Sequence, residues 1–346
     1  MYRHSLSTTE SDQIDGLLDE LTQRYHSVED PELLRELPVV AHRLPLGLRR
    51  FLADFRLIEP APVCVVSGHH VSQQTIGATP EHWSQRSGVS PALREELYLM
   101  LCSAVLGDPF GWATQQDGYL VHDVLPIKGH EQEQIGTGSE QTIWWHVEDA
   151  FHPYRGDYVG LLCLRNPDQV PTTFAGIADL EISDRDREVL AQARYEILPD
   201  NSHLQMLDSG PGRALPGASE LLDRAYQRIK EMRESPTPVP VLFGAPHDPY
   251  LCLDPYFMDL ERLAQSDPEA SAALRRFCDE VDAKLTGAAL APGDVLFVDN
   301  YRAVHGRQAF KARFDGTDRW LKRVNVVRDL RRSRDARHRA ESRILF

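Results

Sequence analysis

The sequence predicts a mainly β protein with flanking helices, built on a double-stranded β-helix (jelly-roll) core that surrounding helices cover. Two observations predict this class. Apolar runs of strand length, bounded by turn residues, recur between about 110 and 328, whereas helical periodicity dominates the N-terminal third and returns in later segments. Two of the strand-like segments also carry histidines suited to a shared metal, His146 and His305, and a jelly-roll core can bring such strands around one site.

The N-terminal third reads as helix with one strand. Apolar residues at helical spacing follow Ser11, a predicted N-cap, and the helical pattern extends over residues 10–56. A Pro-bounded apolar run predicts a short strand at 60–67. Ser90 and Pro91 predict the cap and the first position of a further helix.

Strands dominate the rest of the chain, with helices between them. The predicted strands span 119–125, 158–164, part of 237–257, 294–299 and about 319–327, and the predicted helices span 183–196, 218–233 and 267–285. Turn residues without a period predict a lid loop at about 198–216. We therefore expect one domain, 1–346, that comprises a helical part (about 10–106), a jelly-roll core (about 110–328), the lid, and a basic C-terminal tail, 329–346, solvated and partly disordered.

Composition is that of an ordinary globular protein, with 42% hydrophobic and 26% charged residues in 346. The net charge of −14 argues against a nucleic-acid binder. It also favours a basic tail that is solvated over one that binds nucleic acid. The five cysteines are scattered and form no CxxC pair, which excludes a disulfide framework and favours core thiols in a reducing cytosol. No run of 18 apolar residues occurs and the N-terminus lacks a signal-like apolar segment, so we expect a cytoplasmic protein without membrane partners.

The most informative motif is His146-Val-Glu148, paired with the distant His305. Two imidazoles and one carboxylate can bind one face of Fe(II) and leave the opposite face open for oxygen and a co-substrate. The His-x-Glu spacing suits a strand, because residues i and i+2 point to the same side. The same ligand types also make a catalytic zinc site, so a zinc hydrolase is the first alternative.

An arginine follows the second histidine by fourteen residues. The guanidinium of Arg319 could grip a dicarboxylic acid such as 2-oxoglutarate bidentately, and it has no evident task in a hydrolase. The intact ligand set together with Arg319 and Arg323 also argues against the second alternative, a non-enzymatic binding or sensing protein. The pattern therefore indicates a non-heme iron, 2-oxoglutarate-dependent oxygenase.

Three other motifs have simpler interpretations. Gly136 and Gly138 predict a turn beside the active site. His69 and its neighbour His70 lie far from the ligand segments in sequence, which favours a surface position. Trp144 and Trp145 are expected in the core, with one of them close to the site.

Five stretches carry a resemblance to a known family. They are Trp145-His-Val-Glu-Asp-Ala-Phe-His-Pro-Tyr-Arg155, Leu161-Leu-Cys-Leu-Arg-Asn-Pro-Asp168, Leu198-Pro-Asp-Asn-Ser-His-Leu204, Gly293-Asp-Val-Leu-Phe-Val-Asp-Asn-Tyr-Arg302 and Asp315-Gly-Thr-Asp-Arg-Trp-Leu-Lys-Arg-Val324. The sequence resembles the clavaminate synthase-like branch of Fe(II)/2-oxoglutarate oxygenases, with a cupin-type jelly roll. Within it the chain is most similar to the hydroxylases that act on free L-arginine in the biosynthesis of viomycin- and streptothricin-type antibiotics.

The resemblance implies a role for each matching residue. The iron ligands would be His146, Glu148 and His305, and 2-oxoglutarate would be bound by Arg319 with help from the hydroxyl of Thr173. The expected substrate-binding residues are Arg323 for the α-carboxylate, Gln115 (or equally Gln116) for the α-amino group, Asp200 in the lid, Glu148 beside the metal, and Asp254 for the side chain. The cofactors are Fe(II), 2-oxoglutarate and O₂, and no separate protein acid or base is expected.

The implied reaction is hydroxylation of C3, C4 or C5 of a free L-amino acid, with succinate and CO₂ as coproducts. A guanidinium prefers a bidentate carboxylate partner, which Asp254 offers. The Asp-x-Asp pair expected of a strict arginine enzyme is missing near it, so citrulline, lysine, enduracididine and desaturation of arginine remain alternatives to arginine hydroxylation. The expected partner is thus a small amino acid, not nucleic acid or a membrane, and the sequence leaves the oligomeric state open.

Overall fold

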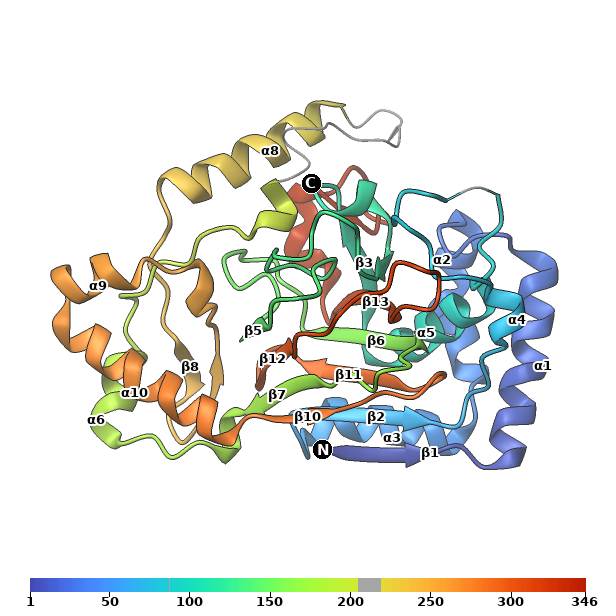
Figure 1. The fold of residues 1–346 in the computed structure, drawn as a ribbon, viewed down its shortest axis with the longest axis horizontal. Coiled ribbons are helices and arrows are strands. Elements are labelled where there is room, and N and C mark those ends of the chain that lie inside the picture. The colour runs from blue at the N-terminus through green and yellow to red at the C-terminus, as the bar shows by residue number, and fades with distance from the viewer. Residues whose placement is uncertain (87, 205–218) are drawn as a thin grey trace.

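The computed structural model describes residues 1–86, 88–204 and 219–346 and arranges them as two β-sheets between two groups of helices (Figure 1). Side chains of both sheets meet in one apolar cluster that includes Val159, Leu161 and Leu296 from the larger sheet and Phe174 and Ala303 from the smaller one. The sheets therefore pack face to face. The molecule is a mixed helix and sheet structure in four layers.

The larger sheet has eight strands in the described part of the chain. Its order is β1-β2-β11-β6-β13-β3-β14, and β4 also pairs with β13. These strands are β1 (Tyr2–Ser5), β2 (Val63–Ser67), β3 (Asp108–Trp112), β4 (Val121–Val124), β6 (Tyr158–Arg165), β11 (Val295–Asp299), β13 (Trp320–Val327) and β14 (Ile344–Leu345). The predicted strands of this sheet are confirmed, whereas the short strands β1, β3 and β14 were not expected.

The smaller sheet carries the histidines. Its order is β10-β7-β12-β5, formed by β5 (Ile143–His146), β7 (Thr172–Gly176), β10 (Thr286–Ala288) and β12 (Ala303–Arg307). The strands of each neighbouring pair are antiparallel. A separate hairpin joins β8 (Leu242–Ala245) and β9 (Asp248–Leu251), where the sequence predicted one or two strands.

Strand β6 shows why the sheets are covered on both sides. Its residues Val159, Leu161 and Cys163 face the other sheet, whereas Tyr158 and Leu162 belong to the cluster formed with the N-terminal helices. Because side chains alternate along a strand, an unbroken apolar run needs apolar partners on both faces. The free thiols fit this pattern, since four of the five cysteines are buried.

The N-terminal helices cover the outer face of the larger sheet. They are α1 (Thr8–Arg24), α2 (Pro31–Val40), α3 (Leu46–Ile58), α4 (Gln73–Ile76) and α5 (Leu93–Leu106), with a 3₁₀ turn η1 (Ala41–Arg43). Two predicted caps were wrong. The N-cap of α1 is Ser7, whose hydroxyl accepts from the Glu10 amide while the Glu10 carboxylate accepts from Ser7. Helix α5 starts at Leu93, after an Ala92 N-cap, so Pro91 lies outside it.

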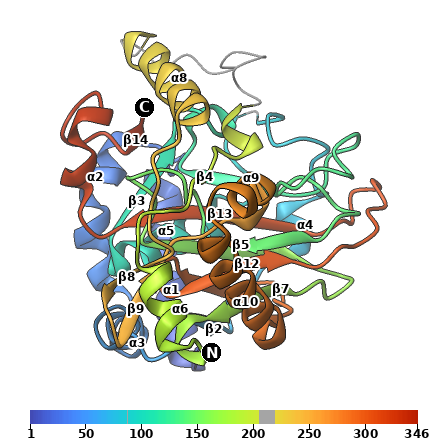
Figure 2. The ribbon, with the colours of Figure 1, turned by 90° about the vertical axis from the view of Figure 1, so that its left-hand side faces the viewer.

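The later helices cover the outer face of the smaller sheet (Figure 2). They are α6 (Asp184–Leu190), α9 (Leu260–Ser266) and α10 (Pro268–Lys284), and α8 (Ser219–Glu234) packs elsewhere; the remaining 3₁₀ turns are η2 (Gln116–Gly118), η3 (Ile177–Asp179), η4 (Pro255–Phe257) and η5 (Leu330–Ala336). Helix α6 is shorter than the predicted 183–196. Residues 201–204 of the predicted lid form a helical turn, and the part of that lid from 205 onward lies outside the described residues.

The C-terminal tail corrects a second expectation. Residues 331, 332 and 338–341 are exposed as expected, but the tail is ordered into η5 and β14, β14 pairs in parallel with β3, and Phe346 is buried. The Arg337 guanidinium is also buried and donates to backbone carbonyls, including those of Ser333 and Ser342. Part of the basic character of this segment is therefore structural.

The expected surface position of His69 is also wrong. The side chain is buried and packs against the ring of Tyr98, with 4.3 Å between the ring centroids. Across the described ranges no helix combines the length and the apolar character that a bilayer crossing requires.

Candidate active site

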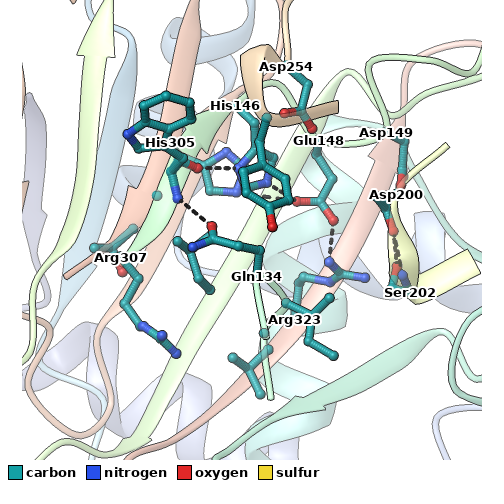
Figure 3. Close-up of a pocket in the computed structure, with 18 of the residues that line it drawn as sticks. Gln134, His146, Glu148, Asp149, Asp200, Ser202, Asp254, His305, Arg307 and Arg323 are labelled. Carbon is teal, nitrogen blue, oxygen red and sulfur yellow. Dashed lines mark hydrogen bonds and ion pairs between the residues drawn. The ribbon is translucent and has the colours of Figure 1, made fainter. Parts of the chain in front are cut away.

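A cavity opens between the two sheets, and most of the residues singled out from the sequence line it (Figure 3). The larger sheet contributes Leu321 and Arg323 on β13, and Arg319 lies directly before this strand. The smaller sheet contributes His146, Thr172, His305 and Arg307, and the loops contribute Gln134, Asp200, Ser202, Asp254 and Tyr256. The cavity thus gathers residues from distant parts of the chain.

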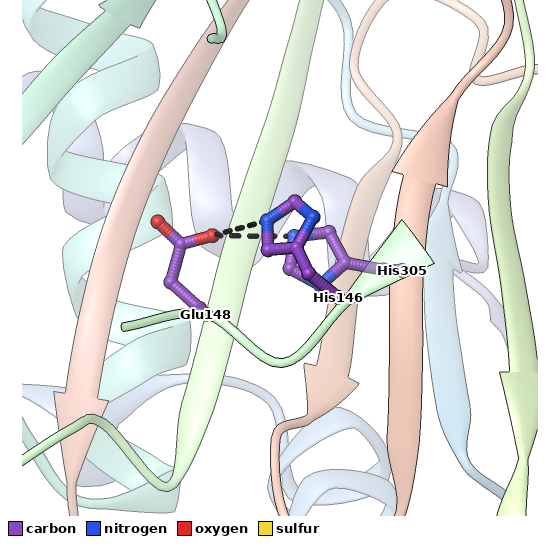
Figure 4. A group of neighbouring side chains, drawn as sticks. All are labelled: His146, Glu148 and His305. Carbon is purple, nitrogen blue, oxygen red and sulfur yellow. Dashed lines mark ion pairs between the residues drawn. The ribbon is translucent and has the colours of Figure 1, made fainter. Parts of the chain in front are cut away.

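The two histidines and Glu148 converge at one point (Figure 4). His146 and His305 are register partners on β5 and β12. Their Nε2 atoms lie 3.6 and 3.3 Å from the same carboxylate oxygen of Glu148, and one ligand atom from each residue lies within 4.8 Å of the others. This geometry suits one small cation, and the nitrogen and oxygen donors are those that Fe(II) accepts.

Strand pairing alone does not place Glu148, because β5 ends at His146. The expected continuous strand over His-x-Glu is therefore wrong. The Glu148 amide instead donates to Oδ1 of Asn300 (2.8 Å), whose Nδ2 donates back to the Glu148 carbonyl (3.0 Å). Asn300 is fully buried and was missed, although it lies in one of the stretches that carry the family resemblance.

A backbone hydrogen bond orients the imidazole of His146. Nδ1 of His146 donates to the backbone carbonyl of Trp144 at 2.8 Å, which leaves the Nε2 lone pair for a metal. Trp144 itself is 46% exposed and lines the cavity, so the expectation of a core position fails for it. Trp145 is buried as expected, and its indole donates to Asp282 at 2.6 Å.

Arg319 is a buried cation without an ion-pair partner among the described residues. Its nearest polar side-chain contact is Oγ1 of Thr172 at 3.5 Å, and its Nε has no hydrogen-bond partner. Burial lowers the pKa of Arg319 to about 10. A buried guanidinium without a counter-ion has a high free-energy cost, because a charge is poorly solvated away from water. This position therefore favours binding of an anionic ligand.

Thr172, and not Thr173, lines this part of the cavity. The two residues are neighbours on β7, so their side chains point to opposite faces of the sheet. The hydroxyl beside Arg319 therefore belongs to Thr172, one residue before the expected Thr173.

Arg307 is a second buried cation that the sequence reading missed. Its guanidinium donates to backbone carbonyls, among them that of Gln141 at 2.8 Å and that of Gly138. Burial, followed by the charge of Arg319, lowers the pKa of Arg307 to about 9. Neither arginine has a carboxylate partner in the ranges described, so this end of the cavity favours an anion.

Arg323 is a third cation of the cavity and contacts the ligand group directly. Its Nη1 donates to Glu148, and its Nη2 donates to Oε1 of Gln115 (3.0 Å) and to Nδ1 of His122 (2.9 Å). Of the two glutamines left open by the sequence, Gln115 contacts Arg323, whereas Gln116 is bonded to the backbone of Asp123. The Gln115 amide continues to Ser202 at 2.6 Å.

Two carboxylates, Asp254 and Asp200, line the cavity away from Arg307 (Figure 3). Asp254 is buried, and burial raises its pKa to about 6. Asp200 accepts from the amide and the hydroxyl of Ser202, at 2.8 and 2.5 Å. Both line the cavity, so a ligand there meets negative charge at one end and positive charge at the other.

A buried ion pair secures the segment that carries Asp200. Nε2 of His203 lies 3.0 Å from Oδ1 of Asp149, the residue after Glu148, and both side chains are fully buried. Thr114 and the indole of Trp112 satisfy the other atoms of the pair, at 2.6 and 2.7 Å. All hydrogen-bonding atoms of the two side chains therefore have partners. This favours a structural role, in which the pair holds the segment of Asp200 in place, over a second metal site.

Comparison with known proteins agrees with this geometry. The chain is 48% identical over 333 residues to enduracididine beta-hydroxylase of Streptomyces hygroscopicus, covering 96% of each. It is 45% identical over the full length of both chains to L-ornithine/L-arginine 3-hydroxylase of Catenulispora acidiphila. It also superposes with a TM-score of 0.92, at 46% identity and full coverage of both chains, on the non-heme iron oxygenase OrfP in complex with Fe, succinate and (3S)-hydroxy-L-Arg.

The family model for taurine catabolism dioxygenase TauD, TfdA family, matches residues 108–325, which contain both histidines, Glu148, Arg319 and Arg323. This match covers most of the chain, and the relatives cover nearly all of it. The chain therefore belongs to the TauD/TfdA family of dioxygenases.

Proposed function

We propose that this protein is an Fe(II)- and 2-oxoglutarate-dependent hydroxylase of free L-arginine or a close cationic analogue, and that it hydroxylates C3. The names of two relatives support this substrate and this carbon. One is an enduracididine beta-hydroxylase and the other an L-ornithine/L-arginine 3-hydroxylase. The OrfP complex with hydroxy-arginine supports the same substrate class.

One observation on the chain itself carries the proposal: the charges of the cavity are arranged around His146, Glu148 and His305. Arg319 and Arg307 supply positive charge at one end, where a dicarboxylate fits, and Asp254 and Asp200 supply negative charge at another. A cationic amino acid needs an anionic site for its side chain and a cation for its α-carboxylate. The cavity offers both beside the three ligands.

The chain's residues then have distinct tasks. His146, Glu148 and His305 hold Fe(II), and Arg319, aided by Thr172, pairs with the distal carboxylate of 2-oxoglutarate. Bound iron supplies the oxidising chemistry, in which O₂ and 2-oxoglutarate are consumed, one oxygen atom enters the substrate, and succinate and CO₂ are released.

The amino acid is held by a second set of side chains. Arg323 binds its α-carboxylate, Gln115 its α-amino group, and Asp254 with Asp200 its cationic side chain. Holding both ends of the substrate determines which C–H bond faces the metal, since a shift of about an ångström changes the carbon attacked.

The arrangement of the two sheets also supports an oxygenase. We assign the two facing sheets as a double-stranded β-helix and the whole chain, 1–346, as one oxygenase domain. A zinc hydrolase, which the ligand types also allow, would leave the buried Arg319 guanidinium without a counter-ion. An iron oxygenase with a dicarboxylate co-substrate gives this residue a partner.

The test is direct. Protein loaded anaerobically with Fe(II) and 2-oxoglutarate is exposed to air with arginine, enduracididine, ornithine, lysine or citrulline, and both succinate and product mass are followed. We expect a gain of about 16 mass units on arginine, stoichiometric with succinate, as oxygen insertion requires, and NMR should place the new hydroxyl on C3. Turnover of enduracididine in preference to arginine would assign the cyclic analogue, and a loss of about 2 mass units would mean desaturation.

A protein that modifies none of these amino acids while it consumes 2-oxoglutarate would contradict the substrate class. A protein that needs zinc and consumes no 2-oxoglutarate would contradict the oxygenase assignment itself.

A further inference from the structure

We propose that His122 is a positioning residue that fixes the substrate-binding guanidinium of Arg323 by accepting one of its N–H groups on Nδ1. This inference rests on the proposed function, in which Arg323 holds the α-carboxylate of the amino acid. His122 stands outside every motif that the sequence analysis singled out.

The contact is built into the sheet. His122 on β4 and Arg323 on β13 are direct register partners across an antiparallel pair. Their side chains therefore project from adjacent points on the same face of the sheet. Nη2 of Arg323 lies 2.9 Å from Nδ1 of His122, and the imidazole is buried.

The direction of this hydrogen bond is unambiguous. A guanidinium can only donate, so Nδ1 of His122 must accept, and the ring proton is therefore on Nε2. Burial, with the charges of Arg323 and Arg86, lowers the pKa of His122 well below its usual value. The neutral ring is the form that can accept from an arginine.

Arg323 thereby loses its rotational freedom. Nη2 gives its two protons to Gln115 and His122, and Nη1 contacts Glu148. Arg323 also lines both the cavity of the metal ligands and an adjacent one, to which His122 and Gln115 belong. A long side chain between two cavities has more than one direction available, and His122 restricts it to the side of the metal.

The strand beneath His122 is itself held in place. Gln116 donates to the Asp123 carbonyl (2.9 Å) and accepts from the Asp123 amide (3.0 Å), so both backbone polar groups of the next residue are bonded. The acceptor is therefore preorganised before substrate binds, and an amino acid need not spend binding energy on orienting Arg323.

The experiment compares two substitutions of His122. His122→Leu removes the acceptor and keeps an apolar side chain in the buried position, whereas His122→Asn keeps an acceptor oxygen close to the place of Nδ1. We measure the dissociation constants of arginine and of 2-oxoglutarate by anaerobic calorimetry on the Fe(II)-loaded enzyme, and the KM and kcat for arginine.

We expect His122→Leu to weaken arginine binding by about tenfold or more, the size of a lost hydrogen bond to a charged group. The dissociation constant of 2-oxoglutarate should stay unchanged, because Arg319 has no contact with His122. His122→Asn should recover most of the arginine affinity. This selectivity separates positioning from a general loss of stability.

His69→Leu is the matched control. His69 is a buried imidazole whose pKa burial lowers to about 4, and it lines neither cavity. We expect this variant to lose stability, as His122→Leu does, and to keep its affinity for arginine.

Three outcomes would overturn the inference. They are an unchanged arginine affinity in His122→Leu, an equal loss of 2-oxoglutarate affinity, or no recovery in His122→Asn when the variant is folded by circular dichroism. Each of these leaves arginine binding by the unsubstituted enzyme intact. If the unsubstituted enzyme itself fails to bind arginine, the proposed function fails, and this inference fails with it.

Discussion

His146 and His305 are directly opposite each other on β5 and β12, so the pairing of two strands that are more than 150 residues apart brings the two imidazoles together. Their ring centroids lie 4.7 Å apart. Because the register of a sheet with a buried face is strongly specified, the spacing of these rings is set by the backbone before any metal binds. The carboxylate of Glu148 then completes the group.

The first prediction tests this group. His305→Ala should lower the affinity for Fe(II) by more than the ~10–100-fold typical of residues that only orient a metal ligand, and turnover should fall below detection. Bound iron is measured by metal analysis after gel filtration, alongside succinate formation. The exposed His70→Ala serves as the control and should bind iron normally. Full iron occupancy in His305→Ala would refute the ligand set.

A pair of neighbouring substitutions tests the assignment of the helping hydroxyl. Thr172→Val removes the group that contacts Arg319, and the KM for 2-oxoglutarate should rise by about tenfold, the effect of one hydrogen bond to a charged group. Thr173→Val, one residue along β7, should change this KM by less than about twofold, because its side chain faces away from the cavity. The reverse order would restore the original prediction from sequence.

Asp254 predicts a pH dependence of substrate binding. Its carboxyl has a pKa of about 6, so it is charged above this pH and neutral below it. Affinity for a cationic amino acid should therefore fall as the pH is lowered through 6, by about tenfold for the loss of a charge-assisted hydrogen bond. Arginine binding is measured by calorimetry from pH 5 to 8. Asp254→Asn should bind weakly at every pH without this transition, and a wild-type-like profile in this variant would assign the transition to another group.

A last prediction concerns stability. Lys322 is a buried residue of β13 on the face away from the cavity, with Nζ 2.8 Å from Glu96 and 2.5 Å from Asp123. Lys322→Met removes the cation that compensates two buried carboxylates, and the free energy of unfolding should fall by about 3–5 kcal/mol. Urea unfolding followed by circular dichroism measures this loss. Lys311→Met, at an exposed site, should be neutral within about 0.5 kcal/mol.

Local patterns were sufficient for much of the fold. Apolar residues at helical spacing correctly predicted α10 over its whole length, and an unbroken apolar run correctly predicted β6. Such patterns report burial of a whole element, which nearby sequence determines. They predict the ends of elements poorly, as the caps of α1 and α5 show, since several polar residues near a helix start can act as the cap.

The sequence by itself determined the family and the residues that could bind iron and a dicarboxylate. The reason is that metal binding and dicarboxylate binding each require particular residue types, and the His-x-Glu pair, the distant histidine and the following arginine are of those types. Only the tertiary structure decided which face of β7 meets Arg319, that Asn300 holds Glu148, that the basic tail packs into the sheet, and that His122 meets Arg323. Each of these depends on strand register or on contacts between segments far apart in the chain. Local sequence constrains neither, because a shift of one residue reverses every side chain of a strand.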